Sequence, residues 1–295
     1  MIIAAAPGDV PPGPKVVAVG SFDGVHLGHQ SLLARARTLA HEAGWPLLVY
    51  TFDPPTKVFV RGVGMLSTLS EKLDLLTQQG VDVTLAVPFD EAFAARDHEA
   101  FLDDLRRLEA GRIVVGEDFA FGRGRTGRPP DLEAVAPTLT IPLLHLGGEP
   151  VKSTRIRELL ETGEVEAARH LLGRSYSARG IVRKGERLGR RLGFPTANVE
   201  TAPGKVLPRG VFAAEVETAD GGYPAVVNVG TRPTLNGGDL RFEAHLIGFS
   251  GELYGHELRV TFLKRLRGEH RFADLKALRA QIARDLEAAR AFFHL

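Results

Sequence analysis

Cysteine is absent from this chain of 295 residues, and its absence excludes disulfides, thiolate metal sites and cysteine nucleophiles together. An excess of charge of one sign is also missing, since 37 Lys and Arg against 36 Asp and Glu leave a formal net charge of +1. Such a balance argues against a protein that coats nucleic acid. No apolar run approaches the ~20 residues of a membrane-spanning helix, so we expect neither nucleic acid nor a membrane as a partner.

Two short signals are missing as well. Residues 1–7 carry no basic region and no apolar stretch long enough for a signal peptide, and we therefore expect a cytoplasmic protein. The pattern G-x-x-x-x-G-K-[ST] occurs nowhere in the sequence, which excludes a P-loop kinase. The composition, 44% hydrophobic and 25% charged, is typical of globular proteins, and the length favours two medium domains or one large one.

Strands and helices alternate in the first half of the chain. Short apolar runs predict strands at 16–19, 46–52, 81–87, 112–115 and 138–144. Helical spacing of apolar residues predicts helices at 30–43, 69–79 and 97–108. This alternation predicts an α/β domain with a parallel sheet and a ligand site at the carboxyl ends of its strands.

The second half changes from helical to strand-like spacing after Gly173. The expected strands are 177–182, 211–217, 225–229, 242–247 and 258–263. Closely spaced strands without helices between them predict an antiparallel barrel. One long helix, 274–293, is expected to pack on the barrel through an apolar stripe of Leu275, Leu278, Ile282, Leu286 and Ala289. The predicted domains are residues 1–173 and 174–295.

A glycine turn with two histidines follows the first expected strand. Glycines at 20, 24 and 28 let the backbone take unusual dihedral angles and come close to a ligand. His26 and His29 stand at the start of the next helix, where free N–H groups favour anions and each imidazole can donate to a phosphate oxygen. The turn therefore predicts a phosphate site. Its alternatives are a helix cap without a ligand and a histidine metal pair, which lacks a Cys or carboxylate ligand at suitable spacing.

Three later segments carry candidate ligand residues. Gly116–Gly127 combines glycines, phenylalanines and arginines, which suits stacking and phosphate binding, although a solvated basic loop is the alternative. Residues 152–157 begin a helix with hydroxyls and an arginine that could hold phosphate groups. In Gly185–Asn198, small residues could wrap a nucleotide, and Thr196 and Asn198 could direct oxygens to one cation; a surface glycine loop is the alternative.

These motifs resemble one family in the same order. His26-Leu27-Gly28-His29 resembles the H-x-G-H signature of the nucleotidyltransferase superfamily. Residues 20–29, 115–127 and 153–157 resemble the adenylyltransferase half of bacterial bifunctional riboflavin kinase/FMN adenylyltransferases, often called FAD synthetases. Residues 185–198 resemble the riboflavin kinase motif, with the P-T-A-N core at Pro195–Asn198. Two later segments, Asn228–Thr234 and Phe242–Leu246, resemble further motifs of the same kinase.

The resemblance covers almost the whole chain after Lys15, with three departures. Lys152 stands where family members often carry Ser, and Gly248 replaces a common acidic residue. In Thr51–Pro55 the second proline comes one residue earlier than in the family pattern T-F-x-P-x-P.

The resemblance implies two ATP-dependent reactions that require Mg²⁺: the barrel would phosphorylate riboflavin to FMN, and the α/β domain would adenylylate FMN to FAD with release of pyrophosphate. It implies that Glu243 is the kinase base, that His26 and His29 serve adenylyl transfer, and that Thr196 and Asn198 bind Mg²⁺. The implied ATP-binding residues are Gly20, Phe22, Asp23, Gly24, Gly28, Asp118, Arg125, Ser153, Thr154, Arg157, Gly185, Gly193, Thr196 and Asn198. The flavin contacts are expected at Phe52, Phe59 and Phe121.

Three other functions fit less of the sequence. Another H-x-G-H adenylyltransferase, acting on a pantetheine or nicotinamide phosphate, would leave Pro195–Asn198 unexplained. A class I aminoacyl-tRNA synthetase would need a K-M-S-K-S loop, which is absent. A nucleic-acid-binding regulator could use Arg123, Arg125 and Arg128, but the near-neutral net charge counts against it.

Overall fold

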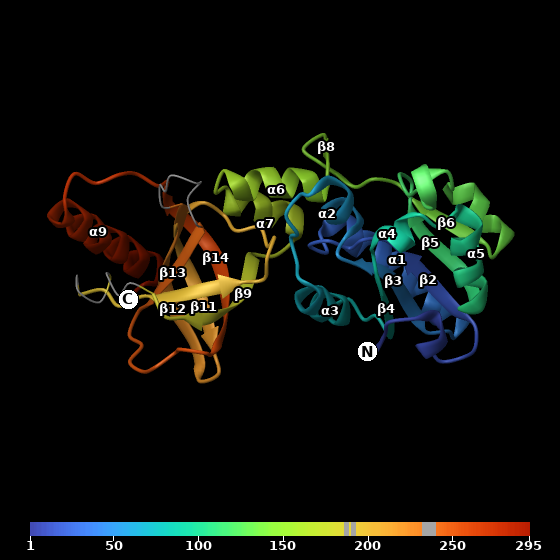
Figure 1. Cartoon of the computed structure of the whole chain (residues 1–295), viewed down its shortest axis with the longest axis horizontal. Helices are drawn as coiled ribbons and strands as arrows, with labels where there is room; N and C mark the ends of the chain where they lie inside the picture. Colours follow the sequence, from blue (N-terminus) through green and yellow to red (C-terminus); the bar gives the residue numbers. More distant parts are fainter. Residues whose placement is uncertain (186–188, 190–192, 232–239) are drawn as a thin grey trace. The chain divides into compact units, whose positions relative to one another are not determined.

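A computed structural model describes residues 1–295 except 186–188, 190–192 and 232–239 (Figure 1). Parts of two motifs, Gly185–Asn198 and Asn228–Thr234, therefore lie outside the described residues. The chain forms two compact units, Met1–Ser153 and Thr154–Leu295. The predicted domain boundary after Gly173 falls at the end of a helix inside the second unit and stays a prediction. None of the helices in the described ranges is both long and apolar enough to cross a membrane.

The first unit is built on a six-stranded sheet with the order β1-β4-β3-β2-β5-β6, and all neighbouring strands run parallel. Its strands are β1 (Ile2–Ala4), β2 (Lys15–Val19), β3 (Leu47–Asp53), β4 (Val83–Pro88), β5 (Ala110–Gly116) and β6 (Thr138–Ile141). The predicted parallel α/β fold is confirmed. Strand β1 was missed, because its three residues are too few to show a period.

Helices connect these strands: α1 (Leu27–Ala43), α2 (Thr56–Arg61), α3 (Leu69–Gln78), α4 (Glu91–Ala94) and α5 (His98–Arg107). Short polar side chains cap the starts of α3, α4 and α5, as helix N-termini favour. Thr68 and Glu71 form a reciprocal capping box at α3, and Asp97 caps α5 by accepting from the backbone N–H of Ala100 at 2.8 Å. Three 3-10 turns, η1 (Pro7–Asp9), η2 (Arg123–Arg125) and η3 (Pro129–Ala134), complete the connections.

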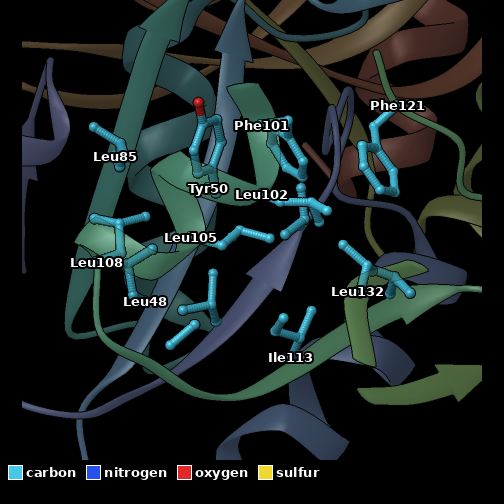
Figure 2. Close-up of a cluster of buried hydrophobic side chains, with 14 of the residues drawn as sticks. Leu48, Tyr50, Leu85, Phe101, Leu102, Leu105, Leu108, Ile113, Phe121 and Leu132 are labelled. Carbon is cyan, nitrogen blue, oxygen red and sulfur yellow. The ribbon is translucent and has the colours of Figure 1, made fainter. Parts of the chain in front are cut away.

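Two hydrophobic cores cover the two faces of the sheet, because successive residues of a strand point to opposite faces. One core packs α5 against the sheet and includes Leu48, Tyr50, Phe101, Leu105 and Ile113 (Figure 2). The other packs α1 against the opposite face and includes Val16, Ala18, Leu33, Ala36 and Val49. Burial on both faces explains why these strands are continuous apolar runs in the sequence.

The second unit contains a closed antiparallel barrel of order β10-β13-β12-β11-β14-β9. Its strands are β9 (Tyr176–Arg183), β10 (Ala197–Thr201), β11 (Gly210–Thr218), β12 (Gly221–Thr231), β13 (Leu240–Leu246) and β14 (Glu257–Arg267). The predicted barrel is confirmed. Strand β10 was missed, because it begins inside an irregular glycine-rich motif. A two-stranded hairpin, β7 (His145–Leu146) and β8 (Glu149–Pro150), ends the first unit.

Helices α6 (Ser153–Glu161), α7 (Val165–Leu172) and α9 (Leu275–Phe293) accompany the barrel. The predicted apolar stripe of α9 is wrong at one position, since Leu275 is 59% exposed. A polar anchor holds the helix instead: Asp285 is only 5% exposed and accepts hydrogen bonds from Arg267 of β14 at 3.0 and 2.8 Å. Gln281 donates to the same carboxylate at 2.7 Å.

Candidate active sites

The loop between β2 and α1 lies at the carboxyl end of the central strands, where parallel sheets place their ligands. Its backbone has positive φ at Phe22, Gly24 and Val25, with values of 46°, 79° and 37°. Such angles are unusual for a ring-bearing or β-branched residue, and surrounding contacts must enforce them. Phe22 is fully buried, and its ring packs against Gly20, where a Cβ would lie 3.2 Å from it.

Asp23 makes some of the contacts that hold the loop in this backbone conformation. Its Oδ1 accepts from the backbone N–H groups of Leu66 and Ser67 at 2.9 and 3.1 Å, and its side chain is almost completely buried. The Ser67 hydroxyl accepts from Gly24 at 3.0 Å, and the Ser153 hydroxyl donates to the carbonyl of Asp23 at 3.0 Å. The Asp23 carboxylate therefore holds the loop together, and its predicted contact with ATP stays a prediction.

The two histidines meet as a stacked pair. Their ring centroids are 3.7 Å apart with planes inclined by 17°. His26 is the N-cap of α1, and its Nδ1 accepts from the backbone N–H of His29 at 3.4 Å. A neutral His26 therefore carries its proton on Nε2, on the side away from the helix. A Cβ on Gly28 would lie 3.2 Å from the His26 ring, so glycine at this position leaves room for the stack.

The segment Gly116–Gly127 places its phenylalanines inward. Phe121 is 7% exposed and packs in the first unit's core with its ring centroid 5.0 Å from that of Phe101 (Figure 2). Gly127 must be glycine, because a Cβ there would lie 2.6 Å from the Phe121 ring. Phe52 is equally buried, at 6% exposed, whereas Phe59 is 39% exposed. Of the three predicted flavin contacts, only Phe59 presents a substantial part of its ring to solvent.

Lys152, which departs from the family pattern, forms an ion pair with a residue of Gly116–Gly127. Its Nζ lies 3.5 Å from the carboxylate of Asp118, and Arg125 donates to the carbonyl of Asp118 at 3.2 Å. Both side chains of the ion pair are substantially exposed, 38% for Lys152 and 61% for Asp118, so the pair can open to admit a ligand at small cost. Thr154 and Arg157 begin α6 in the second unit, and their predicted contact with ATP stays a prediction.

In the second unit, strand register places three polar residues side by side. Glu243 of β13 pairs with Asn198 of β10 on one side and with Asn228 of β12 on the other. Inward residues alternate with these, since Phe242 and Ala244 are buried in the barrel. The row Asn198–Glu243–Asn228 therefore lies on the outer face of the barrel, and Arg241 approaches Glu243 to 3.9 Å along the same strand.

Glycines pack against the predicted cation ligands. A Cβ on Gly185 would lie 2.2 Å from the Asn198 side chain, and one on Gly189 would lie 3.0 Å from the Thr196 hydroxyl. Gly193 takes a φ of 91°, which favours glycine. His245 contacts the carbonyl of Pro195 through Nδ1 at 2.7 Å. The described part of the motif thus leads into β10 and contacts β13 through His245, close to Glu243.

The donor types in this row suit Mg²⁺ bound together with phosphate groups. Magnesium prefers oxygen ligands and is commonly held by one or two protein groups plus substrate phosphates. Thr196 and Asn198 provide a hydroxyl and an amide oxygen near a carboxylate. Among the described residues, no group of three or more His, Cys, Asp and Glu side chains could hold a metal by protein ligands alone.

Comparison with known proteins connects both halves to one enzyme class. The FAD synthetase family model matches residues 10–155, and the riboflavin kinase family model matches residues 172–293. The bifunctional riboflavin kinase/FMN adenylyltransferase of Escherichia coli K12 is 38% identical over 291 residues, covering 95% of this chain and 93% of the relative. The chain belongs to the bifunctional riboflavin kinase/FMN adenylyltransferase family. The bifunctional family member of Bacillus subtilis is 35% identical, covering 95% of this chain and 92% of the relative.

A solved structure agrees over the same length. A crystal structure described as a macrolide-efflux protein from Streptococcus pneumoniae superposes with a TM-score of 0.88 at 29% identity, covering 98% of each chain. The FAD synthetase and riboflavin kinase family models match separate, consecutive residue ranges of the chain.

Sequence reasoning missed two residues near the candidate sites. Asn228 was noticed only as part of a motif, and its register with Glu243 requires knowledge of strand pairing. Lys72 was passed over, because a lysine on an amphipathic helix is ordinarily exposed. One signal was present: Lys72 lies four residues before the buried Leu76, on the same face of α3.

Proposed function

We propose that the loop between β2 and α1 performs adenylyl transfer and that the row Asn198–Glu243–Asn228 performs phosphoryl transfer. The chain has riboflavin kinase and FMN adenylyltransferase activities, so it makes FMN and FAD. What supports the assignment of the kinase site is the register that places Glu243 between two asparagines. A cytoplasmic location belongs to the proposal, because both reactions consume ATP.

In the kinase reaction, the 5′-hydroxyl of riboflavin attacks the γ-phosphorus of ATP, and ADP leaves. An alcohol is a poor nucleophile at neutral pH, so Glu243 accepts its proton as the new O–P bond forms. Asn198 and Asn228 flank Glu243 on the two neighbouring strands. A Mg²⁺ ion bound by Thr196, Asn198 and phosphate oxygens would supply neutralisation of the developing charge.

In the adenylyltransferase reaction, a phosphate oxygen of FMN attacks the α-phosphorus of ATP. The bond to the β-phosphate oxygen breaks, and pyrophosphate leaves. Because the nucleophile is already an anion, no protein nucleophile is needed, and the task of the site is positioning and charge neutralisation. The start of α1 and the Nε2–H of His26 donate to phosphate oxygens, with His29 stacked against His26. Ser153, Asp118 and Arg125 complete the proposed ATP contacts of this unit.

Two variants test the division of the reactions. Glu243→Gln is expected to stop FMN formation while FAD formation from supplied FMN continues, and His29→Ala is expected to do the reverse. Chromatography of flavins after incubation with riboflavin or FMN, ATP and Mg²⁺ measures both. If either variant lost both activities in a folded protein, the two-site assignment would be wrong.

Matched controls separate these effects from general damage. Glu217 is an outward-facing glutamate of the same barrel, exposed and 3.6 Å from Arg259, so Glu217→Gln is expected to leave both activities intact. His41 is an exposed histidine in the last turn of α1, and His41→Ala serves the same purpose for the first unit.

A further inference from the structure

Lys72 is a fully buried lysine at the carboxyl end of the first unit's sheet. It lies on α3, is 0% exposed, and donates from Nζ to the carbonyl of Phe52 at 2.7 Å and to the hydroxyl of Thr51 at 3.4 Å. Both acceptors belong to the last residues of β3. The ammonium therefore ties α3 to the edge of the sheet where the ligand loop begins.

The hydroxyl of Thr51 carries this connection into the loop. It accepts from Lys72 and donates to the carbonyl of Ser21 at 3.2 Å. A second link runs in parallel, because Asp23 binds the backbone N–H groups of residues 66 and 67, just before α3 begins. The start of α3 is thus connected to the loop between β2 and α1 twice, directly by Asp23 and indirectly from Lys72 through Thr51.

We propose that Lys72 is a positioning residue for adenylyl transfer, which fixes the loop carrying His26 and His29 through Thr51 and Ser21 and adds positive charge beneath the phosphates. The proposal rests on the assignment of adenylyl transfer to this loop. A buried ammonium is a costly way to satisfy a carbonyl and a hydroxyl, because the charge loses its hydration on burial. A cation beneath an anion site, in contrast, favours bound phosphate over the empty site.

Two opposing influences of the surroundings set the pKa of Lys72. Burial lowers its pKa to about 8, against the opposing influence of Asp23 in the loop and Asp53 at the end of β3. These two carboxylates are the charged groups that act on the ammonium, and its hydrogen-bond partners are a carbonyl and a hydroxyl. Loss of the proton above pH 8 leaves weaker, uncharged donors to both partners. The rate of adenylyl transfer should therefore fall as the pH rises above about 8.

Lys15 provides a matched control in the same sheet. It is 1% exposed and donates to the carbonyls of Gly13 and Leu108, and burial lowers its pKa as well. It stands at the amino end of β2, the opposite edge from the ligand loop. Lys15→Met and Lys72→Met thus remove the same type of buried group, and only the second reaches the proposed site.

The test compares pH–rate profiles for FAD formation from FMN and ATP by the full-length protein. Wild type is expected to lose kcat as pH rises through about 8. Lys72→Met is expected to lose at least about tenfold in kcat at pH 7 and to show no further fall in kcat above pH 8, while its riboflavin kinase rate is unchanged. Lys15→Met is expected to keep both the wild-type kcat and its fall above pH 8. Equal kcat and equal profiles in Lys72→Met and wild type would overturn the proposal.

Two further variants make every outcome decisive. Thr51→Val keeps the lysine and breaks its link to Ser21, so it should lower kcat and retain the fall in kcat above pH 8. This variant decides the question if Lys72→Met does not fold. An unchanged kcat in Thr51→Val would then overturn the proposal. His29→Ala tests the underlying site. If His29→Ala forms FAD normally, the site assignment fails; if it does not, and Lys72→Met behaves as wild type, only the inference about Lys72 fails.

Discussion

The ring of His26 serves the helix with one nitrogen and a ligand with the other. Nδ1 accepts the N–H of His29, so Nε2 is the nitrogen that can donate to a phosphate oxygen. The sequence left open whether this turn is a helix cap or a phosphate site. In the structure the cap is present, and it sets the proton position that the phosphate-binding role needs.

The stack of the two histidines depends on the absence of a side chain at residue 28. Gly28→Ala would place a methyl group 3.2 Å from the His26 ring, so this ring must shift by a few tenths of an ångström within the stack. We expect kcat for FAD formation to fall about tenfold and riboflavin phosphorylation to be unaffected. The control is Gly8→Ala, where a Cβ meets open space. Normal FAD formation by a folded Gly28→Ala protein would show that the stack is dispensable.

Lys72 also predicts a pH dependence of stability. Its pKa is about 8 when folded and 10.5 in the ordinary state, so between these values the unfolded chain binds more protons. Stability of wild type relative to Lys72→Met should therefore rise with pH from about 8, by at most ~1.4 kcal/mol per pH unit. Burial and Asp104 raise the pKa of Tyr50, which opposes this trend above pH 10 in both proteins. Urea unfolding of both proteins at pH 7 and pH 9.5 measures the difference, and a constant difference would contradict the assigned pKa.

At the scale of elements, the sequence predicted the buried parallel strands well, because each is an apolar run that ends at glycine or proline. It could not predict β10, because this strand begins inside an irregular glycine-rich motif. The glycines at 185 and 189 were visible, but the reason for them, contact with Asn198 and Thr196, exists only in the folded barrel. The family resemblance pointed to Glu243, and the register explains its neighbours.

The anchor of α9 was also invisible in the sequence, because Arg267 and Asp285 look like ordinary charged surface residues. Removal of one partner from a buried pair leaves the other charge uncompensated, so Asp285→Ala should cost about 3–5 kcal/mol of stability. Glu200→Ala removes the exposed pair between Arg183 and Glu200 and should cost no more than about 1 kcal/mol. Thermal unfolding, with riboflavin kinase activity after heating as a second readout, compares the two. Equal losses would show that the buried pair does not anchor the helix.

At the scale of the whole molecule, the two reactions should separate and recombine. His29→Ala alone is expected to convert riboflavin to FMN only, and Glu243→Gln alone is expected to convert it to neither product. A mixture of the two variants should form FAD, because FMN made by one can diffuse to the other. Chromatography of the mixture checks this, and a mixture that accumulates FMN without FAD would show that FMN must stay within one chain.

The register of the barrel constrains chain length as well as chemistry. Glu243 faces outward because it alternates with Phe242 and Ala244, and it meets Asn198 and Asn228 because three strands are aligned. A single inserted or deleted residue within β13 would shift every following side chain to the other face, with the carboxylate inside and an aromatic ring outside. Substitutions along these strands can therefore be gradual, whereas insertions and deletions compatible with kinase activity must fall in the connecting loops.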